Sequence, residues 1–143
     1  MRLILASSSP RRRDLLARIG VTPDSIESPA IDESPKPGEL PRVYALRLAQ
    51  EKAAAVARGD GDVVIAGDTT IALGRRILPP ADSEAIQRDL LRLLSGRRHH
   101  CLSAVCVIGP DGKARVSNRG RPTTPECVPD RKRTNASARP WIA

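Results

Sequence analysis

Residues 3–13 read Leu3-Ile4-Leu5-Ala6-Ser7-Ser8-Ser9-Pro10-Arg11-Arg12-Arg13, an apolar run followed by three hydroxyls, a proline and three guanidinium groups. The apolar residues 3–6 predict a short buried strand. Pro10 fits the first position of a helix capped by Ser9. The chain then continues with apolar residues at helical spacing, namely Leu15, Leu16 and Ile19. The stretch therefore predicts a strand, a tight turn and a helix.

A helix that begins at this turn directs free N–H groups and the positive end of its dipole at the space above the strand. Ser7 and Ser8 add hydroxyl groups there, and the arginines add planar donors suited to phosphate oxygens. The stretch is thus a candidate polyphosphate site without a Walker-type glycine loop. The alternative is an ordinary strand–turn–helix unit whose arginines are solvated.

Strand and helix patterns alternate along residues 1–112, which predicts an α/β fold. The proline-rich, acidic residues 21–41 predict a loop with one short strand. Further elements are expected as a helix from Pro41 to Gly59, strands at 63–66, 71–73 and 76–78, a helix capped by Asp82 or Ser83 and ending before Gly96, and a strand at 101–108. With Tyr44 and Trp141 as the only aromatic residues, the core should be aliphatic.

The pattern stops after the turn that ends at Gly112. Residues 113–143 show neither strand nor helix periodicity, so we expect a disordered, basic tail that is not homologous to the domain at 1–112. The strand at 101–108 should then lack its hairpin partner and expose an aggregation-prone edge.

The net charge of +8 is concentrated in the tail, because eight Lys or Arg residues stand against three Asp or Glu residues from Asp111 onward. The three cysteines have no metal-ligand spacing, and Cys101 and Cys106 are expected to be free buried thiols. The absence of a signal peptide and of a long apolar run predicts a cytosolic protein. Nucleic-acid binding through the tail would rest on charge alone and is disfavoured.

Two acidic clusters follow predicted strands or loops, at Asp32-Glu33 and at Asp68-Thr69. Together with the cations of residues 11–13, they could support metal-assisted attack of water on phosphorus. Asp68 is placed to hold or deprotonate that water. The alternatives are a solvated acidic loop and a plain turn residue. The pair His99-His100 also suggests a metal site, but a solvated strand start beside Arg97 and Arg98 is favoured, because adjacent strand residues face opposite ways.

Several short motifs resemble those of the Maf-like nucleoside triphosphate pyrophosphatases, in the family's order and spacing over about residues 2–112. They are Ala6-Ser7-Ser8-Ser9-Pro10-Arg11-Arg12, Asp32-Glu33, Leu48-Ala49-Gln50-Glu51-Lys52-Ala53, Gly67-Asp68-Thr69 and Ser95-Gly96-Arg97 followed by His99. The resemblance implies a Maf/ITPase-like mixed sheet with flanking helices and a nucleotide cleft, with the C-terminal part missing here. It also implies a homodimer, a divalent cation (Mg²⁺ or Mn²⁺), and hydrolysis of a nucleoside triphosphate to the monophosphate and diphosphate. Family members are associated with removal of non-standard nucleotides and with arrest of cell division.

The family's site residues carry over by position. Asp68 would be the proton acceptor and a metal ligand, and Glu33 the second metal-side carboxylate. The residues that would bind substrate are Ser7, Arg11, Arg12, Lys52 and Thr69. Arg11 and Thr69 in particular resemble the branch that acts on dTTP and UTP.

Two features depart from the family. Pro80 stands where the family usually has a lysine, and a proline supplies neither a cation nor a backbone donor. After Gly112 no family motif is recognisable. The alternative function is therefore a catalytically impaired remnant that binds nucleotide without turning it over.

Overall fold

The computed structural model describes residues 1–123. Nine elements follow one another: β1 (Leu3–Ala6), α1 (Pro10–Arg18), β2 (Ser25–Glu27), α2 (Pro41–Ala54), β3 (Val63–Leu73), β4 (Arg76–Ile77), α3 (Glu84–Leu94), β5 (His99–Ile108) and β6 (Ala114–Thr123). The strands form one sheet in the order β2-β1-β3-β5-β6, and β4 pairs with β3 off this path. β1 runs parallel to β2 and β3, whereas β5 runs antiparallel to its two neighbours, β3 and β6. The predicted α/β fold with a mixed sheet is confirmed.

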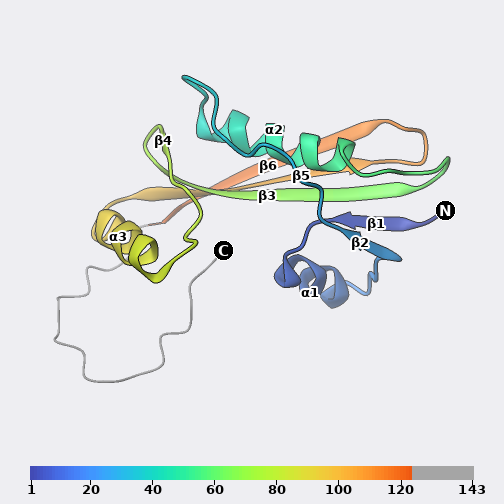
Figure 1. The fold of residues 1–143 in the computed structure, drawn as a ribbon, viewed down its shortest axis with the longest axis horizontal. Helices are drawn as coiled ribbons and strands as arrows, with labels where there is room; N and C mark the ends of the chain where they lie inside the picture. Colours follow the sequence, from blue (N-terminus) through green and yellow to red (C-terminus); the bar gives the residue numbers. More distant parts are fainter. Residues whose placement is uncertain (124–143) are drawn as a thin grey trace.

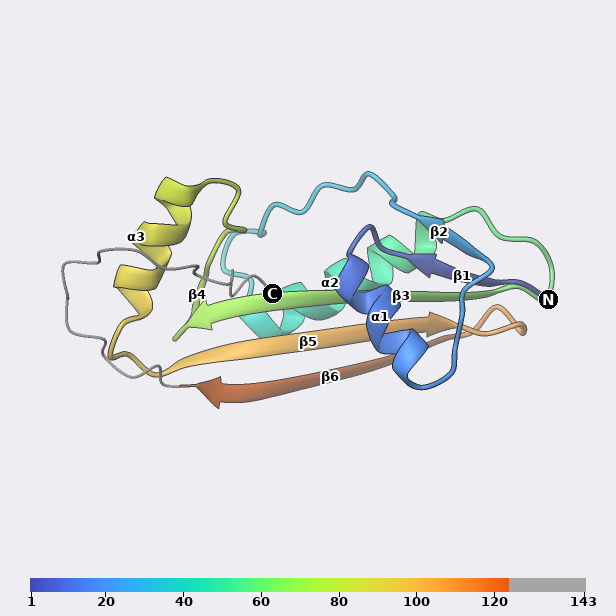
Figure 2. The same ribbon diagram turned by 90° about the horizontal axis from the view of Figure 1, so that it is seen from below.

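The helices lie on both sides of the sheet. In Figure 1, α2 lies above the long strands and α1 lies below them, while α3 lies at the end of the sheet opposite the N-terminus. The view from below shows α1 in front of β3 and β5, which confirms that α1 and α2 are on opposite faces (Figure 2).

The core lies between α2 and the sheet, and it is aliphatic as predicted. Alternate residues of β3 and β5 turn toward α2, whose small alanines allow the helix to lie close to the sheet. The buried residues of this layer include Ala45, Ala49, Ala53, Val64, Ala66, Ala72, Leu102, Ala104 and Cys106. Cys101 and Cys106 are free thiols, as expected, but Cys106 alone of the two is buried, and Cys101 is partly exposed.

Leu48 on α2 is 1 % exposed, so its side chain is fully buried. We expect Leu48→Ala to lower the free energy of unfolding by about 2–5 kcal/mol, because it removes buried methyl groups and leaves a cavity. Leu91→Ala is the matched control, since Leu91 is 55 % exposed on α3 and its loss should cost about 0.5 kcal/mol or less. Urea unfolding of both variants measures the difference, and equal losses would contradict this assignment of the core.

The stretch around residues 3–13 folds as predicted, with one difference in its cap. Ser9 is the N-cap residue of α1 and Pro10 is its first residue, but the Ser9 side chain makes no capping hydrogen bond. The Ser9 carbonyl instead accepts from the Arg12 N–H at 3.2 Å. Gly20 ends the helix with a φ of 74°, a backbone conformation that glycine adopts without strain.

The end of α2 differs from the prediction, whereas the start of α3 agrees with it. α2 ends at Ala54, short of the predicted end at Gly59. Ser83 is confirmed as the cap of α3, because its Oγ accepts from the Ile86 N–H at 3.2 Å.

The prediction that no strand follows Gly112 is wrong. β6 pairs with β5 from Ala114 opposite Ile108 to Thr123 opposite His99, so the predicted unpaired edge of the strand at 101–108 does not occur. The Asn118 Nδ2 also donates to the Arg42 carbonyl at 2.7 Å, which ties β6 to the start of α2. Most of β6 is exposed, so its sequence has no apolar alternation, and main-chain pairing rather than side-chain burial holds it. Residues 124–143 of the predicted tail lie outside the described residues.

β5 begins at His99, earlier than predicted. His99 is buried, and its Nδ1 lies 3.2 Å from the Arg97 carbonyl, so the expectation of a solvated histidine is wrong for this residue. His100 is exposed. None of the helices within residues 1–123 is long and apolar enough to cross a membrane.

Candidate active site

The candidate site lies where β3 loses its neighbour. β1 pairs with β3 only as far as Ala6 opposite Ala66, and β4 begins to pair at Ala72. Over the described residues, no strand pairs with this side of β3 between those two positions. Asp68 lies in this interval, with Gly67 before it.

Asp68 is buried on the face of the sheet that α2 covers, and both of its carboxylate oxygens have partners. The Lys52 Nζ lies 3.1 Å from Oδ1, and the Thr70 hydroxyl donates to Oδ2 at 2.7 Å. These contacts hold the carboxylate in one orientation. Each oxygen keeps a further lone pair, so the carboxylate can still accept a proton from a water molecule.

Lys52 joins Asp68 to the acidic segment, residues 32–39. Its Nζ also lies 3.0 Å from Glu33 Oε1, and its side chain is 13 % exposed. A single ammonium group therefore bridges two carboxylates that are far apart in the chain. The predicted residues Glu33, Lys52 and Asp68 are brought together.

Ser7 and Arg12 form a second part of the site, at the end of β1. The Arg12 Nη1 donates to Ser7 Oγ at 2.8 Å, and the Ser9 N–H donates to the same oxygen at 3.2 Å. A Cβ on Gly67 would lie 3.4 Å from Arg12 Nε, so the arginine side chain lies against β3 at Gly67. Burial lowers the pKa of Arg12, and the charge of Asp68 acts in the opposite direction. The Arg12 guanidinium therefore lies close enough to Asp68 for the two charges to attract each other.

The last two predicted residues are placed differently. Arg11 is exposed on the first turn of α1, and its charge adds to that of Arg12. Thr69 pairs with Ser103 and, because strand residues alternate, faces away from the side that carries Asp68 and α2. The structure therefore does not group the Thr69 side chain with Asp68.

Thr70, Tyr44 and Arg47 contact the site or its acidic segment and were not predicted. Strand alternation could have identified Thr70, which follows Asp68 by two positions on the same face. Tyr44 could have been identified from Lys52, because helix positions separated by multiples of four lie along one face. Burial raises the pKa of Tyr44, and the charges of Asp68 and Glu33 act in the same direction.

The carboxylates of Glu33 and Asp68 fit a divalent cation in one respect. Mg²⁺ commonly binds one or two protein carboxylates and takes its other ligands from phosphates and water. Within the described part of the chain, no three His, Cys, Asp or Glu side chains gather into a metal-binding group. The donor set therefore suits an ion that arrives with a phosphate ligand rather than a closed protein cage.

The acidic segment is attached to α2 by the ion pair of Glu39 and Arg47. Arg47 Nε lies 2.6 Å from Glu39 Oε1, and Nη2 lies 2.8 Å from Oε2, which is a bidentate pair. Hydrogen bonding from Arg47 lowers the pKa of Glu39 from 4.5 to about 2.

This lowered pKa predicts a pH dependence of stability. Because the pKa of Glu39 is lower in the folded state, its contribution is complete above pH 4.5 and is lost as the pH falls toward 2. We expect the parent to lose more stability than Glu39→Gln between pH 6 and pH 3, measured as the urea midpoint. Parallel curves for the two proteins would contradict the pairing.

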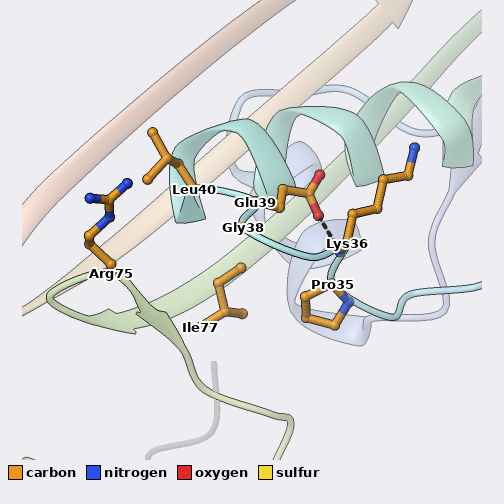
Figure 3. A pocket seen from close by; sticks show the side chains of 7 residues that line it. All are labelled: Pro35, Lys36, Gly38, Glu39, Leu40, Arg75 and Ile77. Carbon is orange, nitrogen blue, oxygen red and sulfur yellow. Dashed lines mark hydrogen bonds between the residues drawn. The ribbon is translucent and has the colours of Figure 1, made fainter.

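A separate pocket lies between the acidic segment and β4 (Figure 3). It has a volume of about 390 Å³ and is lined by Pro35, Lys36, Gly38, Glu39, Leu40, Arg75 and Ile77. None of the predicted site residues lines it. The site around Asp68 is thus an open edge of the sheet and does not coincide with this pocket.

The sequence matches the family model for Maf-like proteins over residues 2–128. The match continues past Gly112, so the expectation that the resemblance ends there is wrong. The dTTP/UTP pyrophosphatase of Sphingopyxis alaskensis is 64 % identical over 114 residues, which are 80 % of this chain and 60 % of that protein. The dTTP/UTP pyrophosphatase of Caulobacter vibrioides is 58 % identical over 113 residues, or 78 % of this chain and 58 % of that protein. The chain thus spans about 60 % of the length of these curated relatives.

Solved structures support the fold. The nucleoside-triphosphatase, or dITP/XTP pyrophosphatase, of Mycobacterium abscessus superposes with a TM-score of 0.54 at 23 % identity, covering 90 % of this chain and 76 % of that one. The Ham1 protein of Staphylococcus aureus gives a TM-score of 0.54 at 18 % identity, covering 85 % and 70 % of the two chains. At these identities the likeness concerns the fold alone.

Proposed function

The chain belongs to the Maf-like protein family, and from this membership and the site geometry we propose that it hydrolyses a nucleoside triphosphate to the monophosphate and diphosphate. The substrates proposed are dTTP and UTP, the nucleotides named for the relatives from Sphingopyxis alaskensis and Caulobacter vibrioides. The observation that carries the proposal is the buried Asp68 carboxylate held by Lys52 at an open strand edge, with the Arg12 side chain next to the adjacent Gly67.

In this proposal Asp68 is the general base. Water attacks a phosphorus atom of the triphosphate, its proton moves to an Asp68 oxygen, and the diphosphate leaves with the electron pair of the broken P–O bond. The Thr70 and Lys52 contacts keep the carboxylate oriented before water arrives. Such fixed orientation lowers the entropic cost of reaching the reactive arrangement.

Cationic and hydroxyl groups would bind the phosphates. Arg12 offers a planar guanidinium, and Ser7 lies within its hydrogen-bonding distance. Lys52 forms ion pairs with two carboxylates. Its ammonium group would contact the phosphates of a bound triphosphate as well as these carboxylates. Arg11 and Thr69 are proposed to contact substrate from outside this cluster, on the basis of the family resemblance.

Glu33 and Asp68 are proposed to hold a divalent cation, Mg²⁺ or Mn²⁺, together with phosphate oxygens. When bound, such an ion would lower the pKa of a bound water and neutralise charge on the leaving group. We also propose a homodimer in the cytoplasm, where nucleoside triphosphates are available. Sedimentation equilibrium measures the assembly state.

The proposal is tested by incubating the purified chain with dTTP or UTP and Mg²⁺ and measuring diphosphate release alongside nucleotide affinity by calorimetry. Release above the uncatalysed rate is expected. One observation favours a second candidate, the impaired nucleotide-binding remnant: Pro80 stands at the position of the family's usual lysine. Binding without diphosphate release would favour this second function.

A further inference from the structure

The acidic segment of residues 32–39, also called the acidic loop, carries Glu33 but forms neither strand nor helix. It links β2 to α2 and runs past the sheet (Figure 1). The Glu33 side chain is 54 % exposed, so burial does not fix it. Contacts elsewhere in the loop must therefore determine where Glu33 lies relative to Lys52.

Arg47 supplies the first set of contacts. Besides its bidentate pair with Glu39, its Nη2 donates to the Ser34 carbonyl at 3.1 Å. One guanidinium thus holds both ends of the loop, at Ser34 next to Glu33 and at Glu39, five residues after Ser34. The Glu39 side chain is 5 % exposed and Arg47 is 15 % exposed, so water screens this pair weakly.

Within the loop, Glu39 also receives a hydrogen bond from the Lys36 N–H at 2.9 Å, the dashed line in Figure 3. The Glu39 N–H in turn donates to the Lys36 carbonyl at 3.0 Å. The turn at residues 36–39 is therefore closed on itself and fixed to α2 through the same carboxylate.

Tyr44 supplies the second set. Its hydroxyl donates to the Glu33 carbonyl at 2.8 Å, and its ring is buried against the helix. The Arg47 guanidinium carbon lies 5.5 Å from the ring centroid, a cation–π distance. The two side chains thus support each other as well as the loop.

We propose that Arg47 and Tyr44 are positioning residues that hold the acidic loop on α2 so that the Glu33 carboxylate meets Lys52 and Asp68. Tyr44, Arg47 and Lys52 project from one helix, so a single rigid element fixes the carboxylate and its ammonium partner. The catalytic consequence rests on the proposed pyrophosphatase function, whereas the placement of Glu33 does not.

The test compares Arg47→Lys and Tyr44→Phe with Glu51→Gln in the full chain. Lysine keeps the charge but lacks the fork, and phenylalanine keeps the ring but lacks the donor. Glu51 is the matched control, because it pairs with Arg47 at 3.1 Å without belonging to the acidic loop.

Three quantities are measured: amide hydrogen exchange over residues 32–39, the rate of Lys52 acylation, and kcat and KM for dTTP with Mg²⁺. We expect both test variants to speed loop exchange and Lys52 acylation about tenfold. We expect kcat to fall about 10–100-fold with KM changed less than about threefold, as for supporting partners of metal-site ligands. Glu51→Gln should match the parent.

The outcomes separate the inference from the function. If the parent hydrolyses no nucleotide, the proposed function is refuted. Faster loop exchange and Lys52 acylation in the two variants would then still support the positioning role. If Lys52 acylation is unchanged in the variants, the positioning role is overturned even if the loop exchanges faster. The same holds if the parent is active and the variants keep its kcat. A fall in the melting temperature with no change in these quantities would likewise leave only a structural role and overturn it.

Discussion

Asp68→Asn is expected to lower the turnover of dTTP or UTP by about 10²–10⁴-fold, the usual contribution of a positioned general base. Asparagine keeps the shape of the side chain, and its amide oxygen can still accept from Thr70, but it cannot take a proton from water. Nucleotide affinity should therefore change only a few-fold. Steady-state diphosphate release and calorimetric binding measure the two effects separately.

The control is Asp111→Asn in the β5–β6 turn. Asp111 pairs with Arg115 at 3.2 Å on the surface, so its loss removes a carboxylate of the same type away from the site. Its turnover should match the parent. Equal turnover by Asp68→Asn and the parent would remove Asp68 from the mechanism.

Truncation after Gly112 should abolish cooperative unfolding. It removes β6, and with it the antiparallel ladder along the whole of β5 and the Asn118 bond to α2. The newly exposed edge would carry unpaired N–H and C=O groups next to the apolar residues of β5. Because a small domain has only about 5–15 kcal/mol of stability, the loss of one ladder of the sheet should be sufficient to unfold it.

Truncation after residue 128, where the family match ends, is the matched comparison because it retains β6. The chain ending at residue 128 should melt in one sharp transition, which circular dichroism measures. A cooperative, monomeric chain ending at Gly112 would show that β6 does not stabilise the domain.

Most of the fold could be predicted from local signals. The apolar run at 3–6 and Pro10 predicted the first strand and the start of the first helix, because each acts on the backbone locally. Ser7, Arg12, Glu33, Lys52 and Asp68 were predicted as site residues from short motifs. In the structure Lys52 pairs with both Glu33 and Asp68, and Arg12 contacts Ser7 at the end of β1.

The rest depended on tertiary contacts. β6 has no apolar alternation, because an exposed edge strand is held by its main chain, so its sequence resembles a loop. Thr70 shares a face with Asp68 because residues 63–73 form one continuous strand, whereas the sequence predicted separate strands at 63–66 and 71–73. Arg47 contacts the acidic loop across several residues, and no local pattern indicates such a pair.

The most direct test of the central claim is the identity of the products, followed by ³¹P NMR when the full chain acts on dTTP with Mg²⁺. We expect dTMP and diphosphate in equal amounts, with no inorganic phosphate, and product release about 10²–10⁴-fold slower for Asp68→Asn. Release of inorganic phosphate with dTDP, or an unchanged dTTP spectrum with the parent protein, would contradict it.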